Sequence, residues 1–238
     1  MQAQPSAALR RSHLWPHWAV AAAALLLTVL QSADAAAGEP VAVIEQVEAP
    51  STGLQFMDFV EVGRLIKLRA GESLTLGYFG SCTQERIVGG TVQIGTDQSS
   101  VDGGEITRQQ VECDGGRLQL DANASETSGV MILRKIDPAV TPASEGSLPP
   151  PELVLFHTQP IVGISTPNSL LRIERLDAAE PRIEVRIDSR YLDLSVTGSN
   201  LTPGGLYRAE AVGHSIVFSI DPKASPGGGP IIGRLLYL

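Results

Sequence analysis

The sequence contains few of the residues that usually carry chemistry. Among 238 residues there are two cysteines, four histidines and two tryptophans, and aromatic residues make up only 5% of the chain. Basic residues are outnumbered as well, with 18 Lys+Arg against 26 Asp+Glu and a formal net charge of −8. This balance argues against a broad electrostatic grip on nucleic acid or on an anionic membrane surface. We therefore expect no nucleic-acid partner.

Long apolar runs are scarce too, and the main one lies near the N-terminus. Residues 18–30 form an apolar stretch that follows Arg10 and Arg11 and precedes small residues that include Ala35 and Ala37. This order of basic, apolar and small residues is typical of a cleaved secretory signal peptide. The alternative is an uncleaved membrane anchor, but a bilayer needs about 20 apolar residues. We expect residues 1–37 to be a signal peptide cleaved after Ala35 or Ala37, and the mature protein to be periplasmic or secreted, without a transmembrane segment.

The two cysteines are Cys82 and Cys113. An even number of cysteines in an exported chain favours a disulfide, which we predict between them. A catalytic thiol is the alternative, but it would need a base, and only His157 and His214 lie beyond the signal peptide. Two cysteines without neighbouring histidines also fall short of the four ligands of a structural zinc site. We expect no catalytic, cofactor-binding or metal-binding residues and no cofactor.

A proline-rich stretch, residues 137–152, is the clearest boundary in the chain. Such a run has few hydrogen-bond donors and favours extended conformations. It divides the chain into residues 38–136 and residues 153–238, each long enough for a small domain. The alternative is a proline-rich loop within one domain.

The first of these segments has the pattern of short strands. Apolar residues alternate over residues 62–68 and 73–76, with a turn expected at Ala70-Gly71-Glu72. Three Gly-Gly pairs follow, each leading into an alternating stretch, and we expect them to supply turns. The pairs are Gly89-Gly90, Gly103-Gly104 and Gly115-Gly116. The pattern predicts a small β-roll or meander.

The second segment is again rich in alternating stretches separated by proline and glycine. We expect about six strands there, which predicts a β-sandwich-like module. The stretches are residues 170–176, 182–187, 191–196, 206–212, 214–220 and 231–238. The expected fold class is therefore all-β, with a β-roll or meander followed by a β-sandwich-like module.

Part of the first segment resembles a known family. Residues 62–68, 70–74 and 113–120 are similar to the pattern of FecR-type domains, which are bacterial extracytoplasmic all-β modules. The resemblance implies an exported β-domain. The chain departs from the signalling members of that family, which place the domain after a membrane helix and a cytoplasmic anti-sigma region. The order Gly80-Ser81-Cys82, Gly89-Gly90 and Cys113-Asp114-Gly115-Gly116 is also similar to exported hypothetical proteins of proteobacteria.

These features favour a non-enzymatic exported protein. We expect an interaction or cell-envelope accessory role, with FecR-like sensing as one form of it, and a protein or cell-envelope component as the partner. The chain contains no Gly-x-Ser-x-Gly motif of a serine hydrolase. Two alternatives stay open, an exported hydrolase that uses carboxylates and a periplasmic protein that binds a small ligand or a metal.

Overall fold

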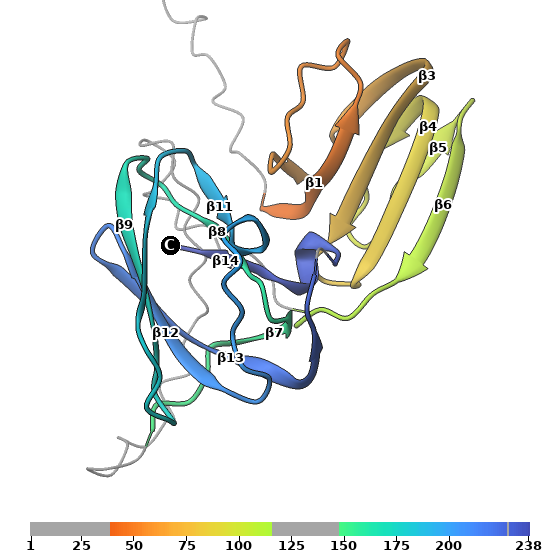
Figure 1. The fold of residues 1–238 in the computed structure, drawn as a ribbon. Coiled ribbons are helices and arrows are strands. Elements are labelled where there is room, and N and C mark those ends of the chain that lie inside the picture. The colour runs from red at the N-terminus through yellow and green to blue at the C-terminus, as the bar shows by residue number, and fades with distance from the viewer. Residues whose placement is uncertain (1–38, 116–147, 228) are drawn as a thin grey trace, which may run out of the picture. The chain divides into compact units, whose positions relative to one another are not determined.

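The computed structural model describes residues 39–115, 148–227 and 229–238, which belong to one compact unit (Figure 1). Almost all regular structure in these residues is β-strand, with two single turns of 3-10 helix. The expected all-β fold class is confirmed. Within the described ranges, no helix is long and apolar enough to cross a membrane. The predicted signal peptide lies outside these residues.

The first segment forms a six-stranded antiparallel sheet in the order β2-β1-β3-β4, with β5 and β6 both paired to the far edge of β4. β3 pairs with β4, as in a meander, and β5 and β6 then follow one another along the same edge of β4 (Figure 1). The strands are β1 (Pro40–Glu48), β2 (Phe59–Glu61), β3 (Leu65–Tyr78), β4 (Thr83–Gln93), β5 (Ser100–Asp102) and β6 (Glu105–Gln110).

One face of this sheet is buried because its apolar residues recur at every second position. Ile66 and Leu68 alternate with exposed residues at the start of β3, and Leu74 and Leu76 continue the buried row. They pack against Ile87 and other apolar residues of β1 and β4 in one cluster. The alternation in the sequence therefore identified the buried face of the first sheet.

The turn expected at residues 70–72 is wrong, because residues 62–68 and 73–76 do not form two separate strands. β3 runs on through this point as a bulge, with Gly71 at φ +83° and a register shift against β4 between Leu68 and Ser73. The Glu72 carboxylate accepts hydrogen bonds from the backbone N–H of Arg69 at 2.7 Å and of Ser51 at 3.1 Å. The bond to Arg69 satisfies a donor that the bulge takes out of the strand ladder, and the bond to Ser51 ties the bulge to the turn after β1, so the chain does not need to reverse here.

The Gly-Gly pairs also differ from expectation. Gly89 and Gly90 lie inside β4 and not at a turn, and Gly103 lies in the bend between β5 and β6, which run in the same direction along β4. A Cβ atom on Gly90 would lie 2.5 Å from the carbonyl oxygen of Asp102 and 2.6 Å from the backbone nitrogen of Gly104. The first two pairs thus let the backbone of β4 and the backbone between β5 and β6 approach each other closely. The third pair begins at Gly115, and its second glycine lies outside the described residues.

We expect Gly90→Ala to lower the free energy of unfolding by at least about 2 kcal/mol, because a positive φ and a backbone clash act together. Gly53→Ala is the matched control. Gly53 has φ +70°, but nothing lies within 4 Å of its added Cβ, so only the conformational cost of about 1 kcal/mol applies. Urea unfolding of both variants measures the difference. Equal losses would show that the close approach at Gly90 does not matter.

The second segment forms two sheets that face each other across a shared core. The five-stranded sheet has the order β10-β9-β12-β13-β7, and the three-stranded sheet has the order β11-β8-β14. The pairs β7–β13 and β8–β14 are parallel, and the others are antiparallel. The elements are β7 (Leu153–His157), β8 (Ile161–Gly163), β9 (Ser169–Arg175), β10 (Ile183–Ile187), β11 (Tyr191–Asp193), η1 (Leu194–Val196), β12 (Leu206–Ala211), β13 (His214–Ser225), η2 (Ile231–Gly233) and β14 (Leu235–Tyr237).

The core between the two sheets has the layout of a sandwich. Inward residues of the larger sheet, such as Leu171 and Phe218, share one buried cluster with Val162 and Leu236 of the smaller sheet. Phe218 also stacks on Tyr207, with 5.7 Å between the ring centroids. This confirms the β-sandwich-like module expected for the second segment.

Two expected strands are shorter than predicted. Residues 191–196 leave the strand after Asp193, whose carboxylate accepts a hydrogen bond from the backbone N–H of Ser195 and starts η1. Residues 231–238 begin with the 3-10 turn η2, and only Leu235–Tyr237 pair as a strand. Five strands have no counterpart among the stretches expected from the sequence: β1, β2, β5, β7 and β8.

The division into two domains stays a prediction, since most of the proline-rich boundary at residues 137–152 lies outside the described residues. The two segments do share an apolar cluster. Val43 and Phe79 of the first segment are grouped in it with Ile161, Ile231 and Leu235 of the second.

Candidate functional site

The aromatic side chains of this chain are concentrated in one place. The sequence has five phenylalanines and four tyrosines. Five of these nine rings lie in two neighbouring groups, a pair and a trio. Phe56 meets Tyr191 edge-on at 5.0 Å between centroids, and Phe59 lies 5.9 Å from Tyr237 and 6.1 Å from Phe79. Such a concentration in a chain poor in aromatics points to a site with a special role.

Four of these rings line an open hollow. It encloses about 420 Å³, part of which is open solvent. Its walls come from the β1–β2 connection, the start of β11 and the last strand, β14. The lining residues are Gln55, Phe56, Met57, Asp58, Phe59, Arg190, Tyr191 and Tyr237.

The β1–β2 connection holds its aromatic residues through backbone contacts. Met57 has φ +69°, an unfavourable region for a residue with a side chain. Its N–H donates to the carbonyl oxygen of Ile44 at 2.9 Å, and the N–H of Ile44 donates to the carbonyl oxygen of Asp58 at 2.8 Å. The Asp58 carboxylate accepts a further bond from the N–H of Gln55. Backbone strain kept in place by such contacts is typical of functional loops.

The hollow carries one charge of each sign, Arg190 and Asp58. Arg190 is exposed and has no ion-pair partner among the described residues, so its guanidinium is available to a ligand. The acid is a single carboxylate and already accepts a backbone hydrogen bond. This arrangement suits binding of an apolar group beside an acidic one, and it lacks the paired carboxylates that glycoside hydrolysis uses.

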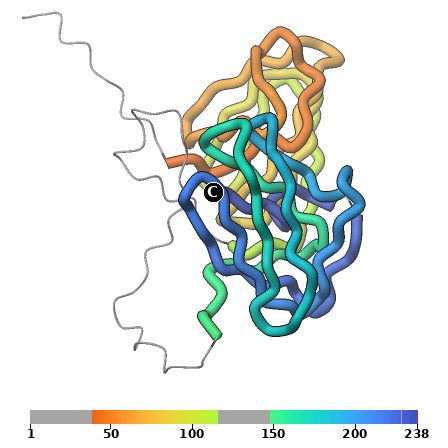
Figure 2. Tube along the Cα trace, turned by 60° about the vertical axis from the view of Figure 1, so that its left-hand side comes forward, coloured from red at the N-terminus to blue at the C-terminus, as the bar shows by residue number. Residues whose placement is uncertain are grey.

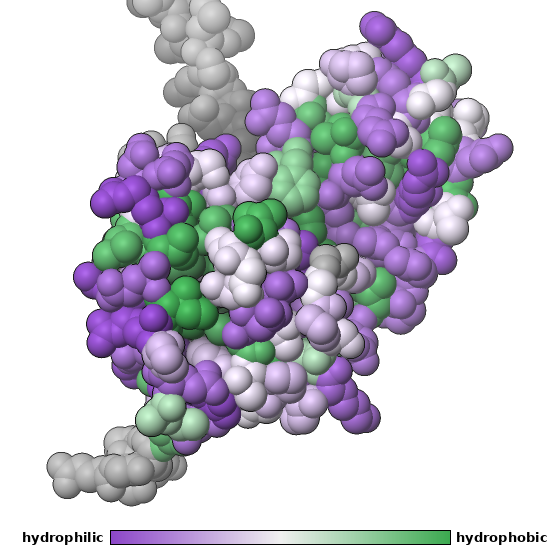
Figure 3. Space-filling view, viewed as in Figure 1, coloured by the Kyte–Doolittle hydropathy of each residue, from purple (hydrophilic) through white to green (hydrophobic). Residues whose placement is uncertain are grey.

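Single apolar side chains are exposed elsewhere on the described surface, among them Val62, Leu65 and Val196. In the face seen in Figure 3, apolar residues lie in several patches separated by polar ones. Scattered exposed apolar residues are normal for a folded protein. The aromatic hollow differs from them because its rings touch in two pairs, Phe56 with Tyr191 and Phe59 with Tyr237.

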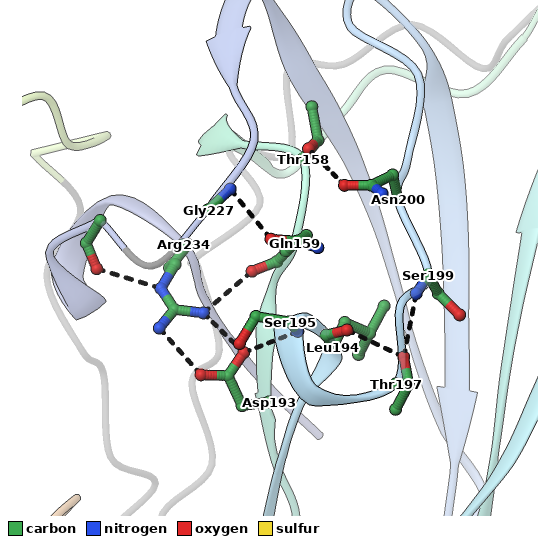
Figure 4. A network of polar contacts seen from close by, with 11 residues as sticks. Thr158, Gln159, Asp193, Leu194, Ser195, Thr197, Ser199, Asn200, Gly227 and Arg234 are labelled. Atoms are coloured by element: carbon green, nitrogen blue, oxygen red, sulfur yellow. Dashed lines mark hydrogen bonds and ion pairs between the residues drawn. The ribbon is translucent and has the colours of Figure 1, made fainter.

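A polar network lies at one end of the smaller sheet, where β11 ends and β8 and β14 begin (Figure 4). The Arg234 guanidinium pairs with both carboxylate oxygens of Asp193, at 2.8 and 2.9 Å, and donates to the carbonyl oxygens of Gln159 and Gly229. Burial would raise the pKa of Asp193, but the hydrogen bonds from Arg234 and Ser195 outweigh it and hold that pKa below its usual value. With these partners satisfied, the network serves the fold and offers no free group to a ligand.

A second, partly buried carboxylate lies at a bulge in β1. The register against β3 shifts between Ile44 and Gln46, which turns Glu45 toward η2. Its carboxylate accepts hydrogen bonds from the N–H of Ile232 at 3.0 Å and from the Gln84 side chain. Burial raises the pKa of Glu45 despite these bonds.

We expect Glu45→Gln to raise stability at neutral pH, by up to about 1 kcal/mol. The raised pKa means that the folded state binds this proton more tightly than the unfolded state does. The contribution of Glu45 to stability is therefore full below its ordinary pKa, near 4.5, and is lost as pH rises through the folded pKa. Urea unfolding of both proteins between pH 4 and pH 8 checks this. A variant that is less stable than the parent at pH 7 would contradict it.

The two histidines beyond the predicted signal peptide lie apart in the fold. His214 is the first residue of β13, opposite Ala211. His157 ends β7, and its Nδ1 atom is buried without a hydrogen-bond partner among the described residues. Burial lowers the pKa of His157, and the positive charge of Arg234 adds to this effect. Neither histidine lines the aromatic hollow.

The predicted disulfide is confirmed. Cys82 and Cys113 are bonded, with 5.5 Å between their Cα atoms. The bond joins the β3–β4 turn to the chain just after β6, and an oxidising compartment is where such bonds persist. Among the described residues, no group of three or more His, Cys, Asp or Glu side chains is arranged to hold a metal ion.

Sequence reasoning missed the aromatic hollow. Its rings come from positions 56, 59, 191 and 237, and nothing in their spacing shows that they meet. The available signal was the scarcity of aromatics, together with the pair Phe56 and Phe59 in a short connection. No family model, curated protein or solved structure matches this chain.

Proposed function

We propose that this is a non-enzymatic exported interaction protein that works as an accessory module of the cell envelope. In this proposal the aromatic hollow holds an apolar side chain of a partner protein, and Arg190 at its wall meets an acidic neighbour of that side chain. The observation that carries the proposal is the set of four aromatic rings, in two contacting pairs, around an open hollow. Aromatic residues and arginine are the side chains that most often dominate binding at protein interfaces.

Two further features support this role. The disulfide fits an exported protein, and the resemblance of residues 62–68, 70–74 and 113–120 to FecR-type domains fits an extracytoplasmic interaction module. A FecR-like sensing role is the form of the proposal that the resemblance favours. The rigid β-framework holds the loop that carries Phe56 and Phe59 in place, which lowers the entropic cost of binding.

Site-specific photo-crosslinking in the cells that make the protein tests this role. A photoreactive residue at Tyr191, on the wall of the hollow, should give one discrete adduct with another protein. The matched control places the same residue at Val196, which is 79% exposed and does not line the hollow. We expect no discrete adduct from position 196.

The adduct should depend on the hollow. With the photoreactive residue at 191, Phe56→Ala removes the ring that packs against this position and should reduce the adduct at least about tenfold, as expected for an aromatic hot spot. The proposal fails if position 191 yields no protein adduct, if positions 191 and 196 yield the same adducts, or if Phe56→Ala leaves the yield unchanged.

A further inference from the structure

β10 is the last strand of the five-stranded sheet, and no strand of the described ranges pairs with its outer edge. Among the described residues, β10 pairs only with β9. Figure 2 brings the teal β9–β10 hairpin to the front of the molecule. A free edge presents unpaired N–H and C=O groups, which can form a ladder with another strand.

This edge lacks three of the devices that prevent pairing, namely a bulge, a proline within the strand and an inward-pointing charge. β10 follows β9 without a register shift, so no bulge twists it away, and its proline neighbour, Pro181, lies outside the strand. No charged residue points inward, because Ile183, Val185 and Ile187 face the core while Glu184 and Arg186 are exposed. The strand is therefore able to accept a partner.

The outer face of the sheet carries charges that alternate from strand to strand. Glu210 of β12 lies opposite Arg172 of β9, and Arg172 lies opposite Glu184 of β10. The Nε atom of Arg172 is 3.3 Å from the Glu184 carboxylate. This row ends on an acid at the free edge, so a basic residue in the next strand would continue it.

A second copy of the same strand supplies that basic residue. If two β10 strands pair antiparallel about a two-fold axis at Val185, Glu184 of each copy lies opposite Arg186 of the other. Ile183 then lies opposite Ile187 of the second copy, and Arg182 opposite Asp188. Arg186 and Asp188 have no ion-pair partner among the described residues, so both are available for these contacts.

Other ways of pairing the two strands are less favourable. A shift of the pairing by one residue position places outward residues against inward ones, and a two-fold axis at Glu184 or Arg186 sets like charges opposite each other. The axis at Val185 pairs all five residues of β10. We propose that the protein forms a two-fold dimer through β10, which joins the two five-stranded sheets into one continuous sheet.

Analytical ultracentrifugation of the purified chain over a range of concentrations tests the dimer. We expect twice the mass of one chain at high concentration. Arg186→Glu and Glu184→Arg each set like charges opposite each other at two symmetry-related places, so each should raise the dissociation constant at least about tenfold. Lys223→Glu makes the same charge change as Arg186→Glu at an exposed site away from β10, and it should leave the dimer unchanged.

Mixing the two single variants provides the decisive measurement. A chain with Arg186→Glu carries two acids on β10, and a chain with Glu184→Arg carries two bases. Their mixture should therefore form a heterodimer although each alone is monomeric, with circular dichroism confirming that both are folded. A parent protein that stays monomeric at every concentration overturns the proposal. So does a dimer that survives both changes, or a mixture that fails to associate.

Discussion

Replacing Arg234 with alanine is expected to lower the free energy of unfolding by about 3–5 kcal/mol, because it leaves a partly buried carboxylate without its counter-charge and two backbone carbonyl groups without their donor. The Arg234 side chain is only 6% exposed, and Asp193 is 23% exposed. The guanidinium also holds the carbonyl oxygens of Gln159 and Gly229. One substitution therefore removes the contacts of Arg234 with the end of β11, with the residues just before β8 and with the loop before η2.

Arg208→Ala is the matched control for this prediction. Arg208 pairs with Glu174 at 3.0 Å, but the two side chains are 34% and 39% exposed. A pair of this kind contributes at most about 1 kcal/mol. Urea unfolding of both variants gives the comparison. Similar losses in the two would show that the Arg234 network does not hold the second segment together.

The Arg234 variant should also change the response to acid. In the parent protein the lowered pKa of Asp193 means that its contribution is present above the ordinary pKa of 3.8 and is lost as pH falls through the lowered value. Without Arg234 the main cause of that lowering is gone, so the contribution should disappear. Urea unfolding between pH 2 and pH 6 should therefore show a free energy of unfolding that changes less at the acid end of this range than it does in the parent protein.

Removing the disulfide is expected to cost about 3–4 kcal/mol. The bonded cysteines are 31 residues apart in sequence, and a crosslink of this span restricts the unfolded chain by about that amount in the chain-entropy model. The bond also keeps Val111 and Cys113 beside the shared apolar cluster, where the N–H of Val111 donates to the carbonyl oxygen of Cys82. Without the bond, we therefore expect the chain that follows β6 to lose its fixed position beside the β3–β4 turn.

The measurement compares the parent protein with Cys82→Ser combined with Cys113→Ser, by thermal and urea unfolding. The parent protein under reducing conditions is the internal control, since it should approach the stability of the double variant. Val62→Ser, which changes an exposed residue of the β2–β3 turn, should stay within about 0.5 kcal/mol of the parent. A double variant as stable as the oxidised parent would contradict the prediction.

Local sequence patterns predicted the strands that alternate cleanly. Residues 170–176 and 182–187 became β9 and β10, and residues 206–212 and 214–220 became β12 and part of β13. The disulfide was predictable because only one pair of cysteines exists. The turn at residues 70–72 was not, because the Glu72 carboxylate bonds to Ser51, which is 21 residues away.

The candidate site could not be predicted in the same way. Phe56 and Tyr191 are far apart in the sequence, and so are Phe59 and Tyr237, and they meet only because the strands that carry them fold together. Arg234 looked like an ordinary polar residue within an apolar stretch. Its burial against Asp193 depends on the parallel pairing of β14 with β8, which has no local signal.

By itself, the sequence determined the all-β class, the buried faces of the alternating strands and the identity of the bonded cysteines. The reason is that each of these depends on the spacing of neighbouring residues or on the count of one residue type. Only the tertiary structure decided the parallel pairings, the aromatic hollow, the Arg234 network and the free edge of β10. Each of these joins residues whose separation along the chain carries no periodicity, so they are specified by packing and hydrogen bonding in the folded state.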